Sequence, residues 1–513
     1  MSASRWVVVV ALTLCGAARA QDGPPTAAEL RAELEALERR LREVERREAG
    51  GDDPLAPPPP LPAEGPAAEG PAAEAPAAEP EKKDPQRIVL QLPRSMSLEL
   101  RGHLRLRGET RHPADYRIPG TFGRPATDGR GSGDDFILQR AWLSLDFTVT
   151  EHLRAVFAIQ DARLWGDHPV GQDSAETFVR EAYIEGRKLF GQPLTVRAGR
   201  SLVPHLGDGR LFHSLDPWAA VPRIWDAVQV TYDPQGWWFS AVASNLREAG
   251  IQTPRGSDND DFWLMGVYAS CRLIEKHELD GYLFHRNLSD RVFASEARAG
   301  RPSRLGERED FTTGARLKGE VGPVGYSGEA VYQWGDQAGD DVRAWAAVTK
   351  AWYTHDLGEG RKVRLGGEYA FASGDRDPTD GKNQTFDPIF PFGHFYHGHM
   401  DLFSWRNMHA ASAQLAVFPL AWLSLHADGH VFWLDSRRDA WYAANKATVR
   451  RDPSGRAGSH VGTELDLYVQ MRLWEERVFV WAGYSHFWTG EYVRATGFSK
   501  DMDWAFLHVE LNF

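Results

Sequence analysis

Apolar and polar residues alternate with a period of two along most of the chain beyond residue 95. In the segment 502–513, for example, Ala505, Leu507 and Val509 share one face, and the mostly polar residues between them share the other. This alternation is typical of a β-strand with one apolar and one polar environment. A strand of about ten such residues is long enough to cross a bilayer at a tilt.

The same pattern predicts eighteen strands in an all-β, antiparallel arrangement. They are expected at residues 96–110, 136–150, 153–165, 177–186, 194–202, 227–233, 237–245, 262–273, 278–287, 310–321, 326–334, 343–355, 362–373, 407–418, 420–435, 462–474, 477–488 and 502–513. Odd-numbered connections are long and even-numbered ones short, with few exceptions. The connections of a soluble sandwich are not expected to alternate in length in this way. Those of a transmembrane barrel are expected to alternate, because its turns are short in the periplasm and its loops are long outside.

The first 94 residues do not share the alternating pattern. A basic residue, an apolar run and an Ala-Arg-Ala site predict a secretory signal peptide at residues 1–20. Leucines at spacings of four and three predict a coiled coil at residues 26–49, with a single solvated helix as the alternative. Residues 50–94 are rich in Pro, Ala and Glu, which predicts an extended disordered linker. The barrel is expected to occupy residues 95–513.

Composition narrows the class of protein further. No apolar run of about 20 residues follows the N-terminal segment, which excludes a helical membrane protein. The net charge of −12 gives no reason to expect nucleic acid as a partner. Removal of residues 1–20 would leave Cys271 as the remaining cysteine, so an intramolecular disulfide is not expected. The tryptophans expected at the two membrane interfaces include Trp237, Trp345, Trp352, Trp422, Trp474, Trp481 and Trp488.

Charged side chains on one face of several strands assign that face to the lumen. In the first strand, Leu104 and Leu106 share one face, while Arg101, Arg105 and Arg107 share the other. An Arg or Lys facing lipid at mid-membrane costs about 2–4 kcal/mol, so we expect this row to face the interior. The same alternation directs further basic residues inward, namely Arg197, Arg316, Lys318, Arg364 and Arg472.

An interior with both arginines and carboxylates has two interpretations. The charges could neutralise one another in a plugged barrel. Alternatively, a row of arginines could attract an anion through bidentate donors, with carboxylates preventing tight binding. The row of basic residues on one face of the first strand favours the anion path.

Two stretches of the chain resemble the alginate export family. Residues 195–233 contain T-V-R-A-G-R, L-G-D-G-R-L and P-R-I-W-D-A-V-Q-V, and residues 373–407 contain S-G-D-R-D-P-T-D-G-K, T-F-D-P-I-F-P-F-G-H and W-R-N. The resemblance covers about residues 95–513. It implies an eighteen-stranded outer-membrane barrel with an arginine-rich conduit for a negatively charged polysaccharide. It also implies a constriction lined or rimmed by Arg180, Glu181, Arg197, Arg200, Asp208 and Arg210. The terminal Phe513 resembles the aromatic insertion signal that ends bacterial outer-membrane barrels.

Residues 374–406 also contain candidate metal ligands. Asp375, Asp377 and Asp380 are spaced like ligands for Ca²⁺ in an extracellular loop, with an ordinary acidic turn as the alternative. A second candidate set, for a transition metal, is His394, His397, His399 and Asp401. The chain lacks a G-x-S-x-G motif, so we expect no enzymatic activity and no resident cofactor.

These observations predict a bacterial outer-membrane barrel that passes an anionic saccharide or polysaccharide by passive diffusion through an Arg-lined lumen. The expected partners are outer-membrane lipid and the anionic saccharide. The coiled coil predicts either a homotrimer or a periplasmic partner. The alternative function is a trimeric, substrate-specific uptake porin for small anions, which would resemble phosphate-selective porins. A third interpretation is a structural barrel tethered by its N-terminal segment.

Overall fold

The computed structural model describes residues 88–93, 96–112, 134–165, 175–214, 218–245, 262–298 and 300–513. The predicted signal peptide, the coiled coil and the first 38 residues of the predicted linker, 50–87, lie outside this part of the chain. Among the residues that the structure describes, no helix has the length and apolar character needed to cross a membrane.

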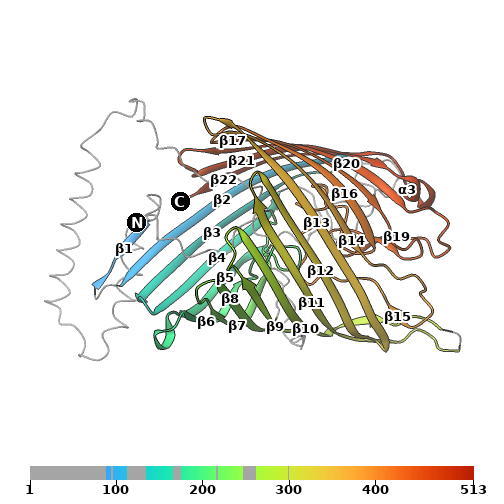
Figure 1. Ribbon diagram of the computed structural model, residues 1–513, viewed down its shortest axis with the longest axis horizontal. Coiled ribbons are helices and arrows are strands. Elements are labelled where there is room, and N and C mark those ends of the chain that lie inside the picture. The colour runs from blue at the N-terminus through green and yellow to red at the C-terminus, as the bar shows by residue number, and fades with distance from the viewer. Residues whose placement is uncertain are drawn as a thin grey trace. The chain divides into compact units, whose positions relative to one another are not determined.

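Within the described ranges, eighteen long strands form a closed antiparallel barrel (Figure 1). Each barrel strand pairs with the next one along the chain. The barrel closes because β2 (Ser97–His112) pairs with both β3 (Asp134–Thr150) and β22 (Met502–Asn512). The other barrel strands are β4 (Leu153–Trp165), β5 (Ala175–Gly186), β6 (Leu194–Leu202), β7 (Ile224–Tyr232), β8 (Trp237–Asn245), β9 (Phe262–Cys271), β10 (His277–Ala294), β11 (Leu305–Val321), β12 (Val324–Gln337), β13 (Asp340–Gly358), β14 (Arg361–Ala372), β16 (Met408–Leu420), β17 (Leu423–Trp433), β20 (His460–Leu473) and β21 (Val478–Thr489).

Several short elements lie outside the eighteen barrel strands. Strand β1 (Ile88–Gln91) pairs with the first residues of β2, and β15 (Lys382–Asn383) pairs in parallel with β13. The connections contain a hairpin of β18 (Ala440–Tyr442) and β19 (Thr448–Arg451), the short helix α3 (Glu491–Thr496) and the 3₁₀ turn η2 (Leu189–Gly191).

The predicted all-β, eighteen-stranded barrel is confirmed. Strands β4, β6 and β8 have the predicted bounds, whereas β10 to β13 are longer than predicted. Most of the added residues lie at the loop end of the barrel, where polar side chains interrupt the alternation, and a few extend the strands at the short-turn end. At the opposite end, β16 continues through Pro419 to Leu420, so the turn is formed by residues 421–422 and not by Pro419 as predicted.

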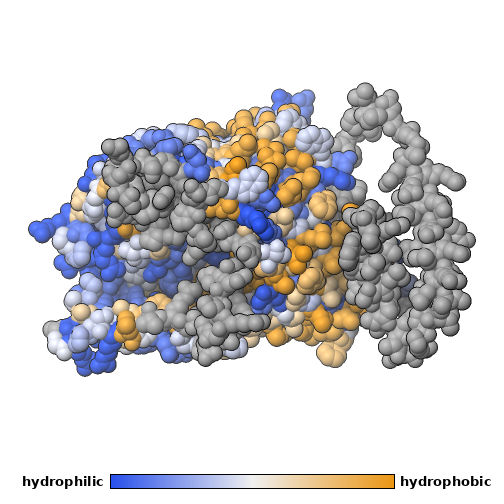
Figure 2. Space-filling view, turned by 180° about the vertical axis from the view of Figure 1, so that it is seen from behind, coloured by the Kyte–Doolittle hydropathy of each residue, from blue (hydrophilic) through white to orange (hydrophobic). Residues whose placement is uncertain are grey.

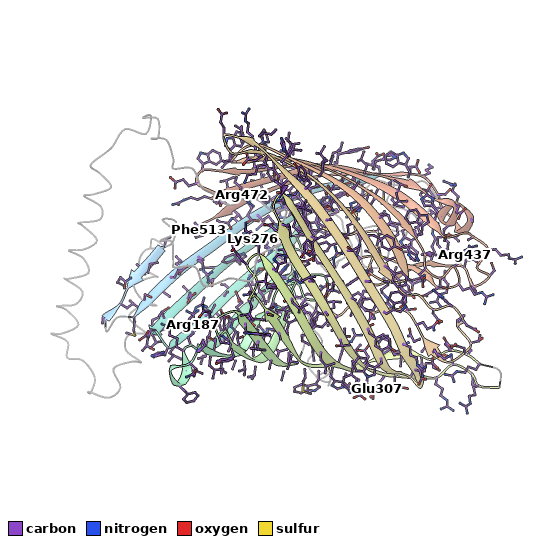
Figure 3. All side chains as sticks on the ribbon, viewed as in Figure 1. Arg187, Lys276, Glu307, Arg437, Arg472 and Phe513 are labelled. Atoms are coloured by element: carbon purple, nitrogen blue, oxygen red, sulfur yellow. The ribbon has the colours of Figure 1, made fainter. Side chains whose placement is uncertain are left out.

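The short turns and the long loops lie at opposite ends of the barrel. Figure 3 shows Arg187, Lys276 and Arg472 near the short-turn end, with Glu307 and Arg437 at the other. One exception occurs at the loop end, where two residues, 338–339, connect β12 to β13.

The outer surface has an apolar band next to the short turns and a polar region at the loop end (Figure 2). On β13, the outward rings of Trp345 and Tyr353 are 50% and 45% exposed and bound this band. Beyond Trp345, Asp341 and Arg343 form an exposed ion pair at 3.0 Å. The prediction that these tryptophans lie at the membrane interfaces is only partly confirmed. Trp481 is buried inside the barrel, and Trp352 lines a cavity there.

Two long loops fold back into the lumen, although the length pattern alone placed long connections outside. They are the loop 203–223, described at residues 203–214 and 218–223, and the loop 373–407. They meet where the amide of Phe390 donates to the carbonyl of Leu211 at 2.8 Å. Their apolar side chains pack with inward residues of the wall into one core. The loop residues of this core include Val203, Leu211, Phe212, Trp218, Phe386, Ile389, Phe390, Phe392, Phe403 and Trp405.

Candidate functional site: the lumen and its inward loops

The predicted row of arginines on β2 lies on the lumen face. Arg105 and Arg107 are buried, and their register neighbours on β22 are Glu510 and His508. Arg107 donates to the carbonyl of Trp218, and its guanidinium carbon lies 3.8 Å from the centre of the Trp218 ring. Burial of this row against protein groups shows that it helps to hold the loop 203–223 in the lumen.

Arg101 and Arg472 lie nearer the short-turn end of the barrel. The Arg101 side chain is 41% exposed, and its guanidinium lies 3.3 Å from Asp146. The Arg472 guanidinium lies 5.9 Å from the centre of the Phe479 ring. Both therefore lie toward the short-turn mouth of the barrel.

Asp208 connects the loop 203–223 to the barrel wall. Gly207 and Gly209 on either side of it have φ of 60° and 75°, which glycine adopts readily and which places Asp208 at a sharp turn. The carboxylate lies 2.9 Å from Arg316 and 3.5 Å from Lys350. Burial would raise the pKa of Asp208, but these two cations hold it well below its usual range.

Arg210 and Arg316 are buried beside carboxylates. Arg210 pairs with Glu368, and its guanidinium lies 4.0 Å from the centre of the Tyr396 ring. Arg316 contacts Asp280 at 2.6 Å in addition to Asp208. These contacts favour local neutralisation at this height of the lumen, so neither guanidinium is available to a solute.

A β-bulge places Arg180 and Glu181 together. The register of β5 against β4 shifts at Arg180, which therefore has no partner position of its own on β4. Arg180 donates to the side chain of Gln160 and lies 5.2 Å from the centre of the Trp142 ring. Its Nε is 3.9 Å from the Glu181 carboxylate. The bulge therefore lets two consecutive charged residues approach the same region of the lumen.

Arg197 and Arg200 lie on opposite faces of β6. Arg197 contacts Glu185 through two guanidinium nitrogens and faces the interior. Arg200 is three residues further along, next to the buried Ser201, so the alternation directs it outward. There it forms a bidentate pair with Asp226, with both distances 2.8 Å. This placement differs from the lumen position that the resemblance implied for Arg200.

The candidate metal ligands do not form a cluster in the described residues. Within the part of the chain that the structure describes, no three His, Cys, Asp or Glu side chains are grouped so that they could hold a metal ion. Asp377 accepts hydrogen bonds from Thr379, and Asp380 forms an ion pair with Lys382 at 2.9 Å. Asp375 instead shares a hydrogen bond with the carboxyl of Glu296.

The histidines of the loop 373–407 are packed among aromatic rings. His394 stacks on Trp218 with ring centres 3.8 Å apart, and its Nδ1 is 3.1 Å from Asp401. Burial lowers the pKa of His394 to about 4 although Asp401 opposes the shift. His399 lies 3.5 Å from Asp466 on β20. These contacts fix the loop inside the barrel.

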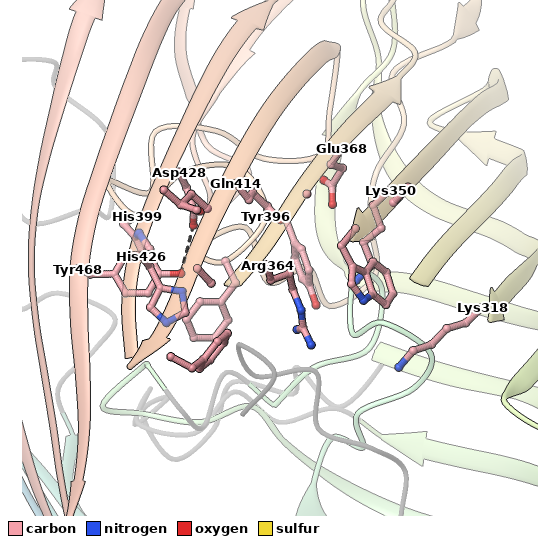
Figure 4. A pocket seen from close by; sticks show the side chains of 17 residues that line it. Lys318, Lys350, Arg364, Glu368, Tyr396, His399, Gln414, His426, Asp428 and Tyr468 are labelled. Atoms are coloured by element: carbon pink, nitrogen blue, oxygen red, sulfur yellow. Dashed lines mark hydrogen bonds between the residues drawn. The ribbon is translucent and has the colours of Figure 1, made fainter. Parts of the chain in front are cut away.

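A cavity of about 160 Å³ remains between this loop and the wall formed by β11 to β20 (Figure 4). Lys318 and Arg364 extend into it, and among the described residues neither has a carboxylate within 4.0 Å. Lys350 lines the same cavity but is shared with Asp208. The cavity is also lined by Trp352, Glu368, Phe395, Tyr396, His399, Gln414, Phe418, His426, Asp428 and Tyr468.

A comparison with protein families identifies the chain. A model of the family described as Alginate export matches residues 110–506, which is most of the chain. The chain belongs to the alginate export family. This family member is therefore a protein of the bacterial outer membrane, and its family and fold are those of outer-membrane channels.

Solved structures share the fold of this alginate export family member. Acinetobacter baumannii OccAB1 has a TM-score of 0.51 and 11% identity, covering 81% of this chain and 96% of its own. Pseudomonas aeruginosa OpdQ and OpdL have TM-scores of 0.50, with 12% and 13% identity, and each match covers 81% of this chain and 98% of theirs. No curated protein matched the chain.

Sequence reasoning missed several charged residues of this family member's lumen, of which Lys350 and Arg154 are two examples. Lys350 lies in the run A-A-V-T-K-A-W-Y, and alternation from the exposed Trp345 would have assigned it to the inner face. Arg154 contacts Asp146 at 2.6 Å and Glu185 at 3.4 Å. The inner face of its strand is otherwise mostly Val and Ala, so no charged row marked it.

Proposed function

We propose that this protein passes an anionic saccharide or polysaccharide across the outer membrane by passive diffusion through its basic lumen. The observation that supports the proposal is the pair of cations, Lys318 and Arg364, that extend into the cavity without a carboxylate within 4.0 Å among the described residues. Fixed cations in a low-dielectric channel attract anions. Most of the other inward arginines described above are engaged by carboxylates or aromatic rings, so these two would select the solute.

A specific observation also favours the second candidate, a channel for small anions. The two inward loops pack a continuous apolar core in the lumen and leave a cavity of about 160 Å³. That space holds a small solute, whereas a polymer chain would have to continue beyond the cavity. The two functions share the anion path and differ in the length of the solute.

The experiment that tests the anion path measures reversal potentials of the purified protein in planar bilayers under a salt gradient. We expect anion selectivity in the wild type and a weaker anion preference in the double variant Lys318→Gln, Arg364→Gln. Arg343→Gln is the matched control, because Arg343 lies on the outer face of β13 with its side chain 58% exposed. Cation selectivity in the wild type would contradict the proposal.

The length of the solute is tested by blocking the current with uronate oligomers of increasing size. A polysaccharide channel is expected to be blocked more strongly as the oligomer lengthens, because each added carboxylate meets further cations. A small-anion channel is expected to show its strongest block with the monomer. Neutral oligosaccharides of equal length are the control for size alone.

A further inference from the structure

The outer face of the barrel carries two ion pairs on the neighbouring strands β4 to β7 (Figure 1). Arg200 on β6 and Asp226 on β7 are register neighbours, and their paired side chains are 28% and 35% exposed. On β4, Asp161 and Arg163 pair at 2.7 Å, and the Arg163 side chain is 61% exposed. Both pairs therefore face whatever surrounds the barrel wall on this side.

These ion pairs lie within the height of the apolar band. Asp226 is six residues from Tyr232, whose ring is 38% exposed at the short-turn end of the same strand. Six residues at about 3.4 Å each and a tilt of about 40° rise by about 16 Å, less than the band height of about 25 Å. Arg163 lies between the exposed side chains of Ile159 and Trp165 on the same face of β4. Hydrocarbon would therefore surround both pairs if lipid covered this face.

Strand β13, elsewhere on the wall, has no charge on its outer face at this height. Its outward residues between Trp345 and Tyr353 are Ala347, Thr349 and Ala351, and the ion pair of Asp341 and Arg343 lies beyond Trp345. Charged side chains that face lipid destabilise a barrel most near mid-membrane and least near the interfaces. The charges on β4, β6 and β7 are therefore better accommodated by a protein neighbour than by lipid.

A second copy of this chain matches the face in charge. Arg163 and Asp226 are exposed on strands three steps apart, so copies that meet side by side can pair Arg163 of one with Asp226 of the next. Such a contact excludes water, which strengthens the attraction between the two charges. Each face thus supplies both halves of the contact.

The start of the described chain lies near the same side of the barrel. It begins at Ile88 in β1, which pairs with β2 at the short-turn end, and β2 is two strands from β4. The predicted coiled coil at residues 26–49 precedes Ile88 in the sequence. As an oligomerising tether it would raise the local concentration of copies at which the walls meet.

We infer that the outer face of β4 to β7 is a contact surface for a second copy of this protein. The inference goes beyond the passage of a solute, since it concerns the assembly of the channel. The ion pairs are withdrawn from lipid in this contact and bridge the two copies. Exposed apolar side chains of the same strands, Ile184, Val228 and Val230, pack between the barrels.

The test is site-specific photo-cross-linking of the full-length protein in cells. Photoreactive p-benzoylphenylalanine replaces Val228 on the proposed face or, as the control, Leu365 on β14. Both positions are exposed on the outer face, at 50% and 56%. We expect ultraviolet light to join two copies through position 228, and position 365 to capture lipid without a second copy.

Variants of the ion pairs show whether these charges hold the contact. Arg163→Gln and Asp226→Asn are each expected to lower the yield of joined copies about tenfold, because one charge-assisted hydrogen bond is lost. Arg343→Gln, outward beyond Trp345, is the matched control and should leave the yield unchanged. Retarded migration of unheated samples on gels shows which variants are folded, and two independent variants guard against failure of one.

Three results would overturn the contact. One is joining of copies through position 365 as efficiently as through position 228, which indicates random collision. Another is the absence of joined copies at position 228, whether lipid, a different protein or nothing is captured there. The third is an unchanged yield of joined copies in both folded ion-pair variants.

Discussion

At the scale of single residues, Asp208 connects an inward loop to the barrel wall. It joins the loop 203–223 to three barrel strands, through Arg316 on β11, Ser327 on β12 and Lys350 on β13. Its backbone carbonyl also accepts a hydrogen bond from Tyr396 of the second inward loop. Through its carboxylate and its backbone carbonyl, Asp208 thus holds both loops and the wall together.

Asp208→Asn is predicted to destabilise the protein by about 3–5 kcal/mol, because a buried charge partner of Arg316 is removed while the cation remains buried. The measurement is a guanidinium titration in detergent followed by tryptophan fluorescence. The control is Asp341→Asn, which removes an exposed ion pair on the outer face and should change stability by less than about 1 kcal/mol. Equal effects of the two substitutions would show that Asp208 does not anchor the loops.

Asp375 is predicted to make its loop sensitive to pH. Burial and the adjacent carboxyl of Glu296 raise the pKa of Asp375 to about 8, whereas an unfolded aspartate titrates near pH 4. The folded state therefore holds a proton that the unfolded state releases. The stability that this proton contributes is fully present below the unfolded pKa and is lost as the pH rises through about 8.

The expected result is a loop that loosens between pH 6 and 9. A nitroxide label on Thr379→Cys, in a Cys271→Ser background, should show increasing mobility over this range by electron paramagnetic resonance. Asp375→Asn should remove the pH dependence, and Asp377→Asn, which alters a carboxylate on the same loop, should leave it in place. A wild-type spectrum that does not change with pH would refute the prediction.

At the scale of elements, the seam between β2 and β22 depends on a glycine. Gly102 and Phe513 exchange backbone hydrogen bonds of 2.7 and 3.0 Å, and a Cβ added to Gly102 would lie 2.1 Å from the Phe513 ring. The terminal ring therefore covers the backbone of Gly102, which is buried, and so protects this part of the seam.

Gly102→Val is predicted to destabilise the barrel by about 1–3 kcal/mol, because the Phe513 ring must leave its place. Gly108→Val is the matched control on the same strand and face, since nothing lies within 4 Å of a Cβ added there. The temperature at which the compact form is lost on gels measures the effect. Similar temperatures for the two variants would mean that the Phe513 contact does not stabilise the seam.

The barrel strands were predictable because alternation is a local signal that a membrane wall enforces on every strand. The inward loops were not, since F-D-P-I-F-P-F in residues 386–392 has no strand period and its rings are buried only by distant partners. For the site, alternation identified Lys318 and Arg364 correctly as inward residues. The resemblance misplaced Arg200, although a separation of three residues from Arg197 already implied opposite faces of a strand.

At the scale of the whole molecule, the predicted coiled coil at residues 26–49 bears on oligomerisation. Deletion of residues 21–85 is predicted to leave a folded barrel, because all barrel strands lie beyond residue 96. We expect the full-length protein to be trimeric and the deletion variant monomeric by light scattering after size exclusion. A deletion variant that remains trimeric would show that the coiled coil is not the oligomerising element.

The length of β13 also determines where the channel begins. Its nineteen residues, at about 3.4 Å each and a tilt of about 40°, rise by about 50 Å, twice the height of an apolar band of about 25 Å. Part of the excess carries Asp341 and Arg343 beyond the ring of Trp345. We therefore predict that the loop end of the channel stands well clear of the apolar band, so that a solute on that side meets protein before it meets a lipid headgroup.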